Sequence, residues 1–357
     1  MSALFFLVLL LHLQFAMVRI FLVLCCLWQI TGGYSKGLAA DSIGNRPLIQ
    51  DTAYIDNLQE KLSIKLFTLN RTNNFTITDI GNNFESNYEP NVGSDLGVGL
   101  VYKWLKVGLA FARISKDGPE SSHGVTRRLD LQGHVFTQKF GADVSVQLYN
   151  GFYLANPATF NKEWKVNDGY PLRSDITTLS LGASGYYVFN HEKFSLQSVY
   201  VQSEWQKKSA GSFFLGGSLN TYAIIADSAI SPENFSNSTN QNNFFEDARF
   251  RSLSPLFGYS HTLVLNENIF TNLTLSPGFA MSNTRLLDAT GAVAYRNNHI
   301  TGRLGLRFGL GYNSRTFFGG FSAEYNYQQF RFNESQGRFG FTRGQARLYV
   351  GYRFDWS

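Results

Sequence analysis

The chain of 357 residues carries a formal net charge of +5 at pH 7, and only 16% of its residues are charged. With 33 glycines, 8 prolines and 15% aromatic residues, it resembles a sheet-rich protein more than a helical membrane protein. The basic residues are scattered, so no nucleic-acid-binding surface is expected.

The N-terminus is typical of a secretory leader. The long apolar run covers residues 3–30, and from Met17 onward it has a basic start at Arg19, an apolar core and then small residues. We predict a signal peptide over residues 1–35, with Met17 as the more natural start. Cleavage is expected after Ser35, or alternatively after Ala39. A single membrane anchor is the competing interpretation, but the core is short for one.

The C-terminal stretch sets the pattern for the rest of the chain. Apolar residues alternate with polar or small ones from Ala346 onward: Ala346, Leu348, Val350, Tyr352, Phe354 and Trp356. Strands place successive side chains on opposite faces, and an apolar face ending in aromatics is typical of a transmembrane β-barrel strand. In residues 302–312 the polar face includes Arg303 and Arg307. Two arginines in a dry sandwich core would cost several kcal/mol each unless paired, so a barrel with a hydrated lumen is favoured.

The connections between these segments come in two sizes, as in outer-membrane barrels. Tight turns are expected at 103–104, 190–193, 266–268 and 313–315, and long loops at 115–124, 156–174, 228–247, 283–298 and 331–338. We predict an all-β, transmembrane, antiparallel up-and-down β-barrel over residues 61–357, preceded by a periplasmic segment, 36–60. About twelve strands are expected, with ten or fourteen as alternatives. The first strand is placed at residues 75–80.

One stretch breaks the alternation of short and long connections. Residues 194–227 contain two strand-like halves where one strand is expected. Either the segment 204–211 is a kink or inward excursion, or a further strand lies nearby. This stretch includes the sequence EWQKKSAGS, from Glu204 to Ser212.

The stretch SEWQKKSAGSFFLGG at 203–217 contains the specific motif EWQKKSAGS, and the motifs LDLQGHVF, YNGFYLANP, YPLRSDI, YVFNHEKFS and GYNSRTFFGG support it. Together these motifs resemble the domain-of-unknown-function 4421 family of Bacteroidota. The resemblance covers residues 51–354 and implies a secreted outer-membrane barrel; the family has no established activity. The chain ends at Ser357 and not at an aromatic, so recognition by the barrel-assembly machinery would depend on Phe354 and Trp356.

The assigned faces predict a polar cluster in the lumen. Its members are Arg303, Arg307, Glu324, Arg347, Arg353 and Asp355. We expect Glu324 to pair with Arg307 or Arg347, and the surplus positive charge to make any pore anion-preferring.

The sequence also contains the residue types of a hydrolase or acyltransferase site that would act on lipid or lipopolysaccharide. The candidates are His134, Asp130 and Ser209, or Ser212 in place of Ser209. No G-x-S-x-G motif accompanies either serine, so ordinary polar lumen residues are the competing interpretation. Lys207 and Lys208 could bind anionic lipid headgroups, or be solvated loop lysines.

No cofactor or metal site is predicted. The six histidines have no metal-ligand spacing, and both cysteines, at 25 and 26, lie in the leader. The expected function is a non-enzymatic outer-membrane barrel, structural or weakly pore-forming. A lipid-modifying enzyme and a surface-binding or transport component are the alternatives. Outer-membrane lipids and the assembly machinery are the expected partners; the sequence does not specify an oligomeric state.

Overall fold

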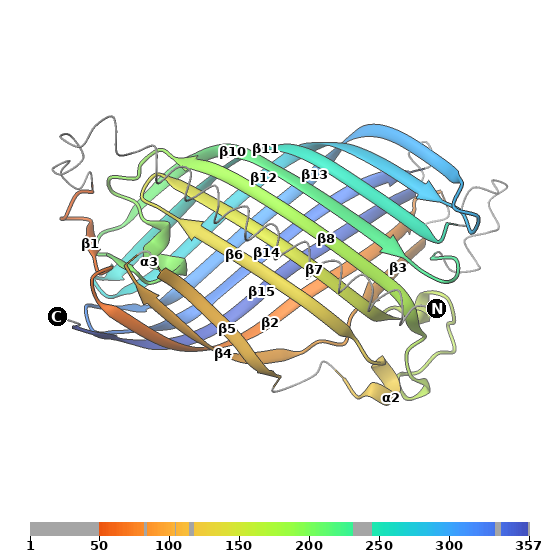
Figure 1. Cartoon of the computed structure of the whole chain (residues 1–357), viewed down its shortest axis with the longest axis horizontal. Coiled ribbons are helices and arrows are strands. Elements are labelled where there is room, and N and C mark those ends of the chain that lie inside the picture. Colours follow the sequence, from red (N-terminus) through yellow and green to blue (C-terminus); the bar gives the residue numbers. More distant parts are fainter. Residues whose placement is uncertain are drawn as a thin grey trace, which may run out of the picture. The chain divides into compact units, whose positions relative to one another are not determined.

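The computed structural model describes residues 50–355, apart from 82–83, 104, 114–117, 231–244 and 333–336. The predicted leader, its cleavage sites and Trp356 lie outside the described residues. The described chain forms an all-β antiparallel barrel, the predicted fold class (Figure 1). Within these residues, no helix has both the length and the hydrophobicity to cross a membrane.

Long strands build most of the wall. They are β2 (Leu62–Asp79), β7 (Phe140–Leu154), β8 (Leu172–Val188), β10 (Ala210–Ile225), β11 (Asp247–Asn266), β12 (Ile269–Leu287), β13 (Val293–Asn313), β14 (Phe317–Phe332) and β15 (Gly337–Phe354). Shorter wall strands are β3 (Phe84–Glu89), β4 (Ser94–Tyr102), β5 (Leu105–Arg113) and β6 (Arg127–Phe136). The remaining elements lie at the barrel ends: β1 (Ile55–Asn57), α2 (Glu120–His123), η1 (Pro157–Thr159), η2 (Val166–Asp168), α3 (Leu196–Tyr200) and β9 (Glu204–Gln206).

The hydrogen-bonded ring closes on ten strands: β2, β3, β7, β8 and β10 to β15, with β15 paired to β2. Three further strands, β4, β5 and β6, are attached to this ring. Both β3 and β4 pair with the edge of β2 that β15 leaves free, so they act as one wall strand interrupted at residues 90–93. Counted this way the wall has twelve strands, which is compatible with the prediction of about twelve with ten as an alternative.

The wall has one interruption, between β5 and β6. Within the described residues β5 pairs only with β4, and β6 only with β7. The ring is closed beyond this point by two residue pairs between β3 and β7, Tyr88 with Leu154 and Glu89 with Tyr153. We call the space between β5 and β6 the seam, and the two residue pairs the clasp.

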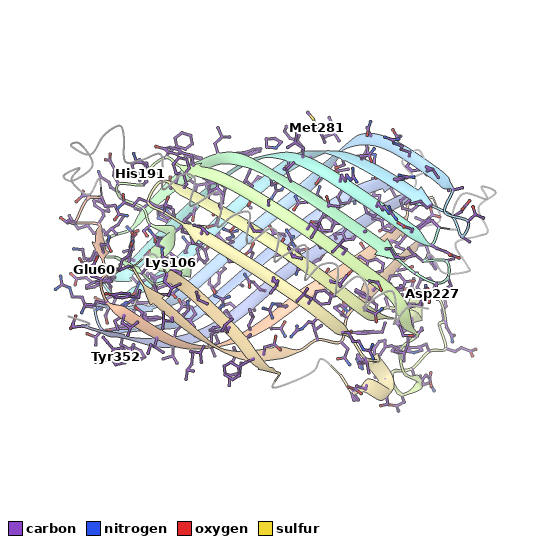
Figure 2. The ribbon with its side chains drawn as sticks, viewed as in Figure 1. Glu60, Lys106, His191, Asp227, Met281 and Tyr352 are labelled. Carbon is purple, nitrogen blue, oxygen red and sulfur yellow. The ribbon has the colours of Figure 1, made fainter. Side chains whose placement is uncertain are left out.

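Side chains alternate across the wall as the sequence pattern predicts. On β15, Leu348, Val350 and Tyr352 point outward and are 60%, 45% and 47% exposed, while Tyr349 and Arg353 are buried inside. Met281 and Tyr352 lie on the outer surface in Figure 2. The outer face is rich in exposed leucine, valine and phenylalanine, which is the exterior that a membrane-spanning barrel presents to lipid.

The lumen near the long loops is filled by an aromatic core. Its members include Phe75, Tyr88, Phe152, Phe250 and Phe330, all at most 2% exposed. Buried or partly buried members come from every strand of the ten-stranded ring, so the cluster crosses the whole lumen. The sequence prediction of a polar lumen therefore holds only for part of the barrel.

The opposite end, with the short turns, is closed by a plug, which we define as residues 190–208. This segment contains α3 and β9, and β9 pairs with β1. The side chain of Ser195 caps α3 by accepting from the Ser198 N–H at 3.0 Å, and α3 buries Leu196 and Val199. Of the two interpretations of residues 194–227, the inward excursion is the one that the structure adopts, and it begins earlier than expected, near Phe194.

Two predicted boundaries were wrong. The first strand of the barrel wall, β2, begins at Leu62, well before Phe75, and the loop expected at 283–298 spans only residues 288–292. In both places polar residues continue a paired strand: β12 and β13 stay in register from Asn283 opposite Asn298 to Leu286 opposite Tyr295. Their length exceeds the roughly nine to eleven residues that span a bilayer, so polar residues near the strand ends can face water.

Candidate functional site

A polar chamber lies in the lumen between the plug and the aromatic core. It comprises two cavities of about 80 and 320 Å³ that share Gln132, His134, Arg307, Glu324 and Gln345 in their walls. Inward residues of strands around the barrel line it, because every second side chain of each strand points into the lumen.

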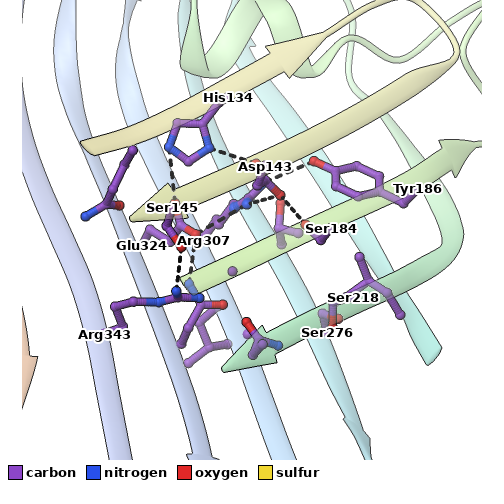
Figure 3. A pocket seen from close by; sticks show the side chains of 18 of the residues that line it. His134, Asp143, Ser145, Ser184, Tyr186, Ser218, Ser276, Arg307, Glu324 and Arg343 are labelled. Atoms are coloured by element: carbon purple, nitrogen blue, oxygen red, sulfur yellow. Dashed lines mark hydrogen bonds and ion pairs between the residues drawn. The ribbon is translucent and has the colours of Figure 1, made fainter. Parts of the chain in front are cut away.

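Four charged or titratable side chains meet in the chamber (Figure 3). The Nδ1 atom of His134 lies 2.7 Å from Oδ1 of Asp143, and Nη2 of Arg307 lies 2.8 Å from Oδ2 of Asp143. The same Arg307 nitrogen is 3.3 Å from Oε1 of Glu324, so of the two partners predicted for Glu324, Arg307 and Arg347, the structure has Arg307. His134 stands directly opposite Asp143 in the β6–β7 register, and Arg307 opposite Glu324 in β13–β14.

Neutral groups complete this network. Ser184 Oγ donates to Asp143 at 3.0 Å, Asn326 Nδ2 donates to Glu324 at 2.8 Å, and Tyr186 OH accepts from Arg307 at 3.0 Å. Gln345 Nε2 lies 3.1 Å from His134 Nε2 and 3.3 Å from Glu324 Oε2. Because each charge has partners, the cluster can be buried without a large electrostatic penalty.

The predicted catalytic candidates do not come together. Asp130 bonds with Tyr149, Gln132 and Gln147, and not with His134. Ser209 is exposed and accepts a hydrogen bond from the backbone of Val264. The acid beside His134 is Asp143, which the sequence argument passed over although a tight β6–β7 turn would place it opposite His134.

Of the six residues predicted for the lumen cluster, five lie in the barrel interior. Arg303 donates to Ser218, Arg347 packs over the Phe67 ring, and Arg353 is 1% exposed beside the plug. Asp355 is the one that does not lie in the interior. Its side chain is 83% exposed and pairs with Lys61 at 2.6 Å. β15 ends at Phe354, so beyond that residue the inward-outward alternation no longer fixes the direction of a side chain.

Lys207 and Lys208 lie at the plug end of the barrel, beside Tyr54. The backbone N–H of Lys207 donates to Tyr54 O at 2.7 Å, and Lys208 Nζ lies 5.4 Å from the Tyr54 ring centre. Their side chains are outside the chamber. Their position at the plug end of the barrel is the one reason that they stay candidates for contact with anionic lipid.

A second ionic group faces the seam. Arg71 pairs with Asp95 at 2.9 Å and with Asp130 at 3.5 Å, and Arg128 also pairs with Asp95. These side chains line an opening of about 830 Å³ together with β5 residues such as Leu109 and β6 residues such as Leu131. Part of this site was missed because the sequence interpretation began the first strand at Phe75 and therefore left out Arg71.

The fold, its apolar exterior and its polar chamber define a membrane-spanning β-barrel with a largely filled lumen. The chain belongs to the family "Domain of unknown function (DUF4421)", whose sequence model matches residues 49–354. A search of curated proteins finds no match.

Three solved structures illustrate the structural similarity. The outer membrane protease OmpT of Escherichia coli matches with a TM-score of 0.40 at 8% identity, over 84% of this chain and 98% of that one. The toluene transporter TodX of P. putida matches with a TM-score of 0.20 at 9% identity, over 84% and 91%. The Ail protein of Yersinia pestis matches with a TM-score of 0.20 at 14% identity, over 63% and 100%. Such distant likeness says nothing about activity.

Proposed function

We propose that this protein is an integral outer-membrane barrel whose chamber binds a ligand taken from the bilayer through the seam, in a binding or transport role. The predicted signal peptide and the apolar outer face support this location. A diffusion pore along the barrel axis is a poorer fit, since the plug and the aromatic core both lie across the lumen.

The observation that carries the proposal is the seam. Unpaired backbone N–H and C=O groups cost several kcal/mol each in hydrocarbon, so barrels that span membranes normally leave no open strand edge. Here the facing edges of β5 and β6 are unpaired within the described residues, and the opening beside them leads to charged side chains. A wall built this way suits an amphiphile whose polar end satisfies these groups while its apolar part stays in the lipid.

The surfaces around the seam have the matching chemistry. Leu109 and Phe111 on β5 are 68% and 67% exposed on the outer face, and Val135 on β6 is 63% exposed. Arg71 and Arg128 lie behind this rim, paired with acids in the opening. An apolar rim before a polar interior favours ligands that have one apolar and one polar end.

Conductance recordings of the purified, folded protein in a planar bilayer test whether the lumen conducts ions. We expect no stepwise conductance, with an open porin in the same bilayer as the positive control. Regular conductance steps from the intact protein would restore the pore interpretation and remove this proposal.

Access through the seam is tested with cysteines on its two sides. Leu109→Cys with Leu131→Cys, bridged by a bifunctional thiol reagent, should slow the uptake of an amphiphile that the unbridged protein binds. The matched control is Leu306→Cys with Tyr325→Cys, directly opposite residues of the paired β13 and β14. Bridging this control pair should leave uptake unchanged.

The hydrolase alternative is not favoured by any contact. In Ser-His hydrolases, the histidine lies next to a hydroxyl nucleophile. Within the described chain, the hydrogen-bond partners of His134 are Asp143 and Gln345. The His134–Asp143 pair is therefore assigned to the satisfied network of the chamber.

A further inference from the structure

Three cations in the larger cavity of the chamber have no acidic partner. Lys65 on β2, Lys106 on β5 and Arg347 on β15 line the cavity of about 320 Å³. In the part of the chain that the structure describes, none of them forms an ion pair with a carboxylate. The neighbouring cations differ in this respect, because Arg307 pairs with Asp143 and Glu324, and Arg71 with Asp95.

Each of the three is held by neutral groups. Lys65 Nζ lies 3.3 Å from Gln202 Oε1 and 5.9 Å from the Tyr349 ring centre, while the Arg347 guanidinium lies 5.0 Å from the Phe67 ring centre. Lys106 donates to the carbonyl oxygen of Phe136 at 3.3 Å and to the side chain of Gln197. These contacts orient the cations, but none of them is an ion pair with a carboxylate.

The acids closest to this cavity are already engaged. Glu324 lines it, but its oxygens bond with Arg307, Asn326 and Gln345. The buried Glu204 of the plug accepts hydrogen bonds from four side chains: Gln50, Gln59, Ser195 and Gln197. Buried charges are normally paired, so three cations in one cavity that form no ion pair indicate a site for an anion supplied from outside.

Beside these cations, two glycines on β4 leave the inner surface of the wall without side chains. A Cβ atom at Gly99 would lie 2.8 Å from Lys65 side-chain carbons, and one at Gly97 would lie 2.4 Å from the Phe67 ring. Glycine at these two positions therefore lets the side chains of β2 extend beneath β4, toward the seam. The same cavity shares Arg71, Gly108 and Gln132 with the opening at the seam, so the two spaces adjoin and Lys106 lies in the wall of the inner one.

We infer that Lys65, Lys106 and Arg347 form a binding site for a phosphoryl group. This inference builds on the proposed function and names the chemistry of its ligand. A phosphoryl group carries nearly two negative charges at pH 7 and three strong acceptor oxygens, which suit three cationic donors that line one cavity. Its source is either the headgroup of a membrane amphiphile or a soluble phosphate.

The experiment measures binding to the purified full-length barrel in a neutral maltoside detergent by calorimetric titration. The probes are dodecyl phosphate, inorganic phosphate and dodecyl trimethylammonium. The variants are Lys65→Gln, Lys106→Gln and Arg347→Gln. Lys103→Gln is the matched control, because Lys103 lies in the exposed β4–β5 turn and pairs with Glu60 at 3.5 Å.

We expect dodecyl phosphate to bind and dodecyl trimethylammonium not to bind. Each chamber variant should weaken dodecyl phosphate binding at least tenfold, and Lys103→Gln should leave it unchanged. Binding of dodecyl phosphate alone identifies a membrane amphiphile as the source, whereas binding of inorganic phosphate with equal affinity identifies a soluble one. The three variants should keep the heat-modifiable gel migration of a folded barrel.

Failure of this inference is distinguishable from failure of the proposed function. If dodecyl phosphate binds but all three chamber variants bind it as well as the parent, the phosphoryl site is wrong while the ligand-binding chamber stands. If the variants weaken binding but the thiol bridge between the Leu109→Cys and Leu131→Cys positions does not slow it, the phosphoryl site stands and entry through the seam is wrong. Absence of binding by both phosphate probes would remove the phosphoryl site.

Discussion

Arg353, near the end of the last strand, donates from Nη2 to the carbonyl oxygen of Gln202 in the plug at 2.5 Å. Its guanidinium also bonds with Asn313 and Ser314, and it packs over the Phe318 ring. One buried side chain thus joins the barrel wall to the segment that closes the lumen.

Arg353→Gln should loosen the plug. It would leave buried carbonyl oxygens without donors, which we expect to lower the free energy of unfolding by about 2–3 kcal/mol. The measurement is denaturant unfolding in detergent micelles, together with limited proteolysis within residues 190–208. Arg315→Gln is the control, because Arg315 is exposed and pairs with Asp56, and its loss should cost about 0–1 kcal/mol. Equal effects of the two substitutions would contradict this role of Arg353.

Glu204 should make stability depend on pH. Burial raises the pKa of its carboxyl group, and the hydrogen bonds from Ser195 and Gln50 offset this only in part. The folded protein then keeps a proton in a pH range where the unfolded chain has lost it, so the free energy of unfolding falls as pH rises. This fall begins near the ordinary glutamate pKa of about 4.3 and ends at the raised value.

Glu204→Gln should remove that fall. Unfolding midpoints measured at several pH values above 4 should become flatter than those of the parent protein. Glu60→Gln, at an exposed position that pairs with Lys103, serves as the control and should keep the parent's slope. A Glu204→Gln protein with the parent's full pH dependence would show that another group is responsible.

Glu324→Gln should destabilise the chamber more than a change on the outer face beside it. It leaves Arg307 with Asp143 as its remaining acid, and we expect a loss of about 1–3 kcal/mol. Tyr325→Phe, one residue further along β14 and 40% exposed, should change stability by less than about 0.5 kcal/mol. Thermal unfolding in the same detergent compares the two. A larger effect of Tyr325→Phe would mean that the faces of β14 are assigned wrongly.

The seam should be visible in hydrogen exchange. Amides of β5 and β6 that face the seam have no ladder partner, so peptides covering 105–113 and 127–136 should exchange faster than a peptide covering 251–262 of β11. β11 is paired on both edges, with β10 and β12. Equal protection of the three peptides in detergent would show that β5 and β6 pair in solution.

The faces of the wall could be predicted from sequence because alternation is a local property. The direction of Leu348 and Arg347, or of Leu306 and Arg307, follows from adjacent positions in one strand. The pairing of Glu324 with either Arg307 or Arg347 also followed, because consecutive strands are neighbours in the wall. The same reasoning applied to the β6–β7 turn would have paired His134 with Asp143.

The filling of the lumen could not be predicted in this way. The inward residues Phe339 and Phe341 meet Phe250 and Tyr222 from strands far away in sequence, and only the closed ring brings them together. The plug is equally nonlocal, since Asn313 holds it through the carbonyl oxygens of Ser198 and Glu204. The seam is a missing pairing, and a pattern of strands does not reveal which neighbours fail to bond.

The clasp makes the wall mechanically uneven. Around most of the ring, continuous ladders of hydrogen bonds resist the separation of neighbouring strands. At the seam, strand pairing is limited to Tyr88 with Leu154 and Glu89 with Tyr153, at one end of a slit. Elsewhere along the slit, side-chain contacts such as that of Lys106 with the carbonyl oxygen of Phe136 cross it. Under the proposed function, lateral pressure from the surrounding lipid would act on the width of that slit, and the thickness and chain packing of the bilayer would then influence how readily the chamber exchanges its contents.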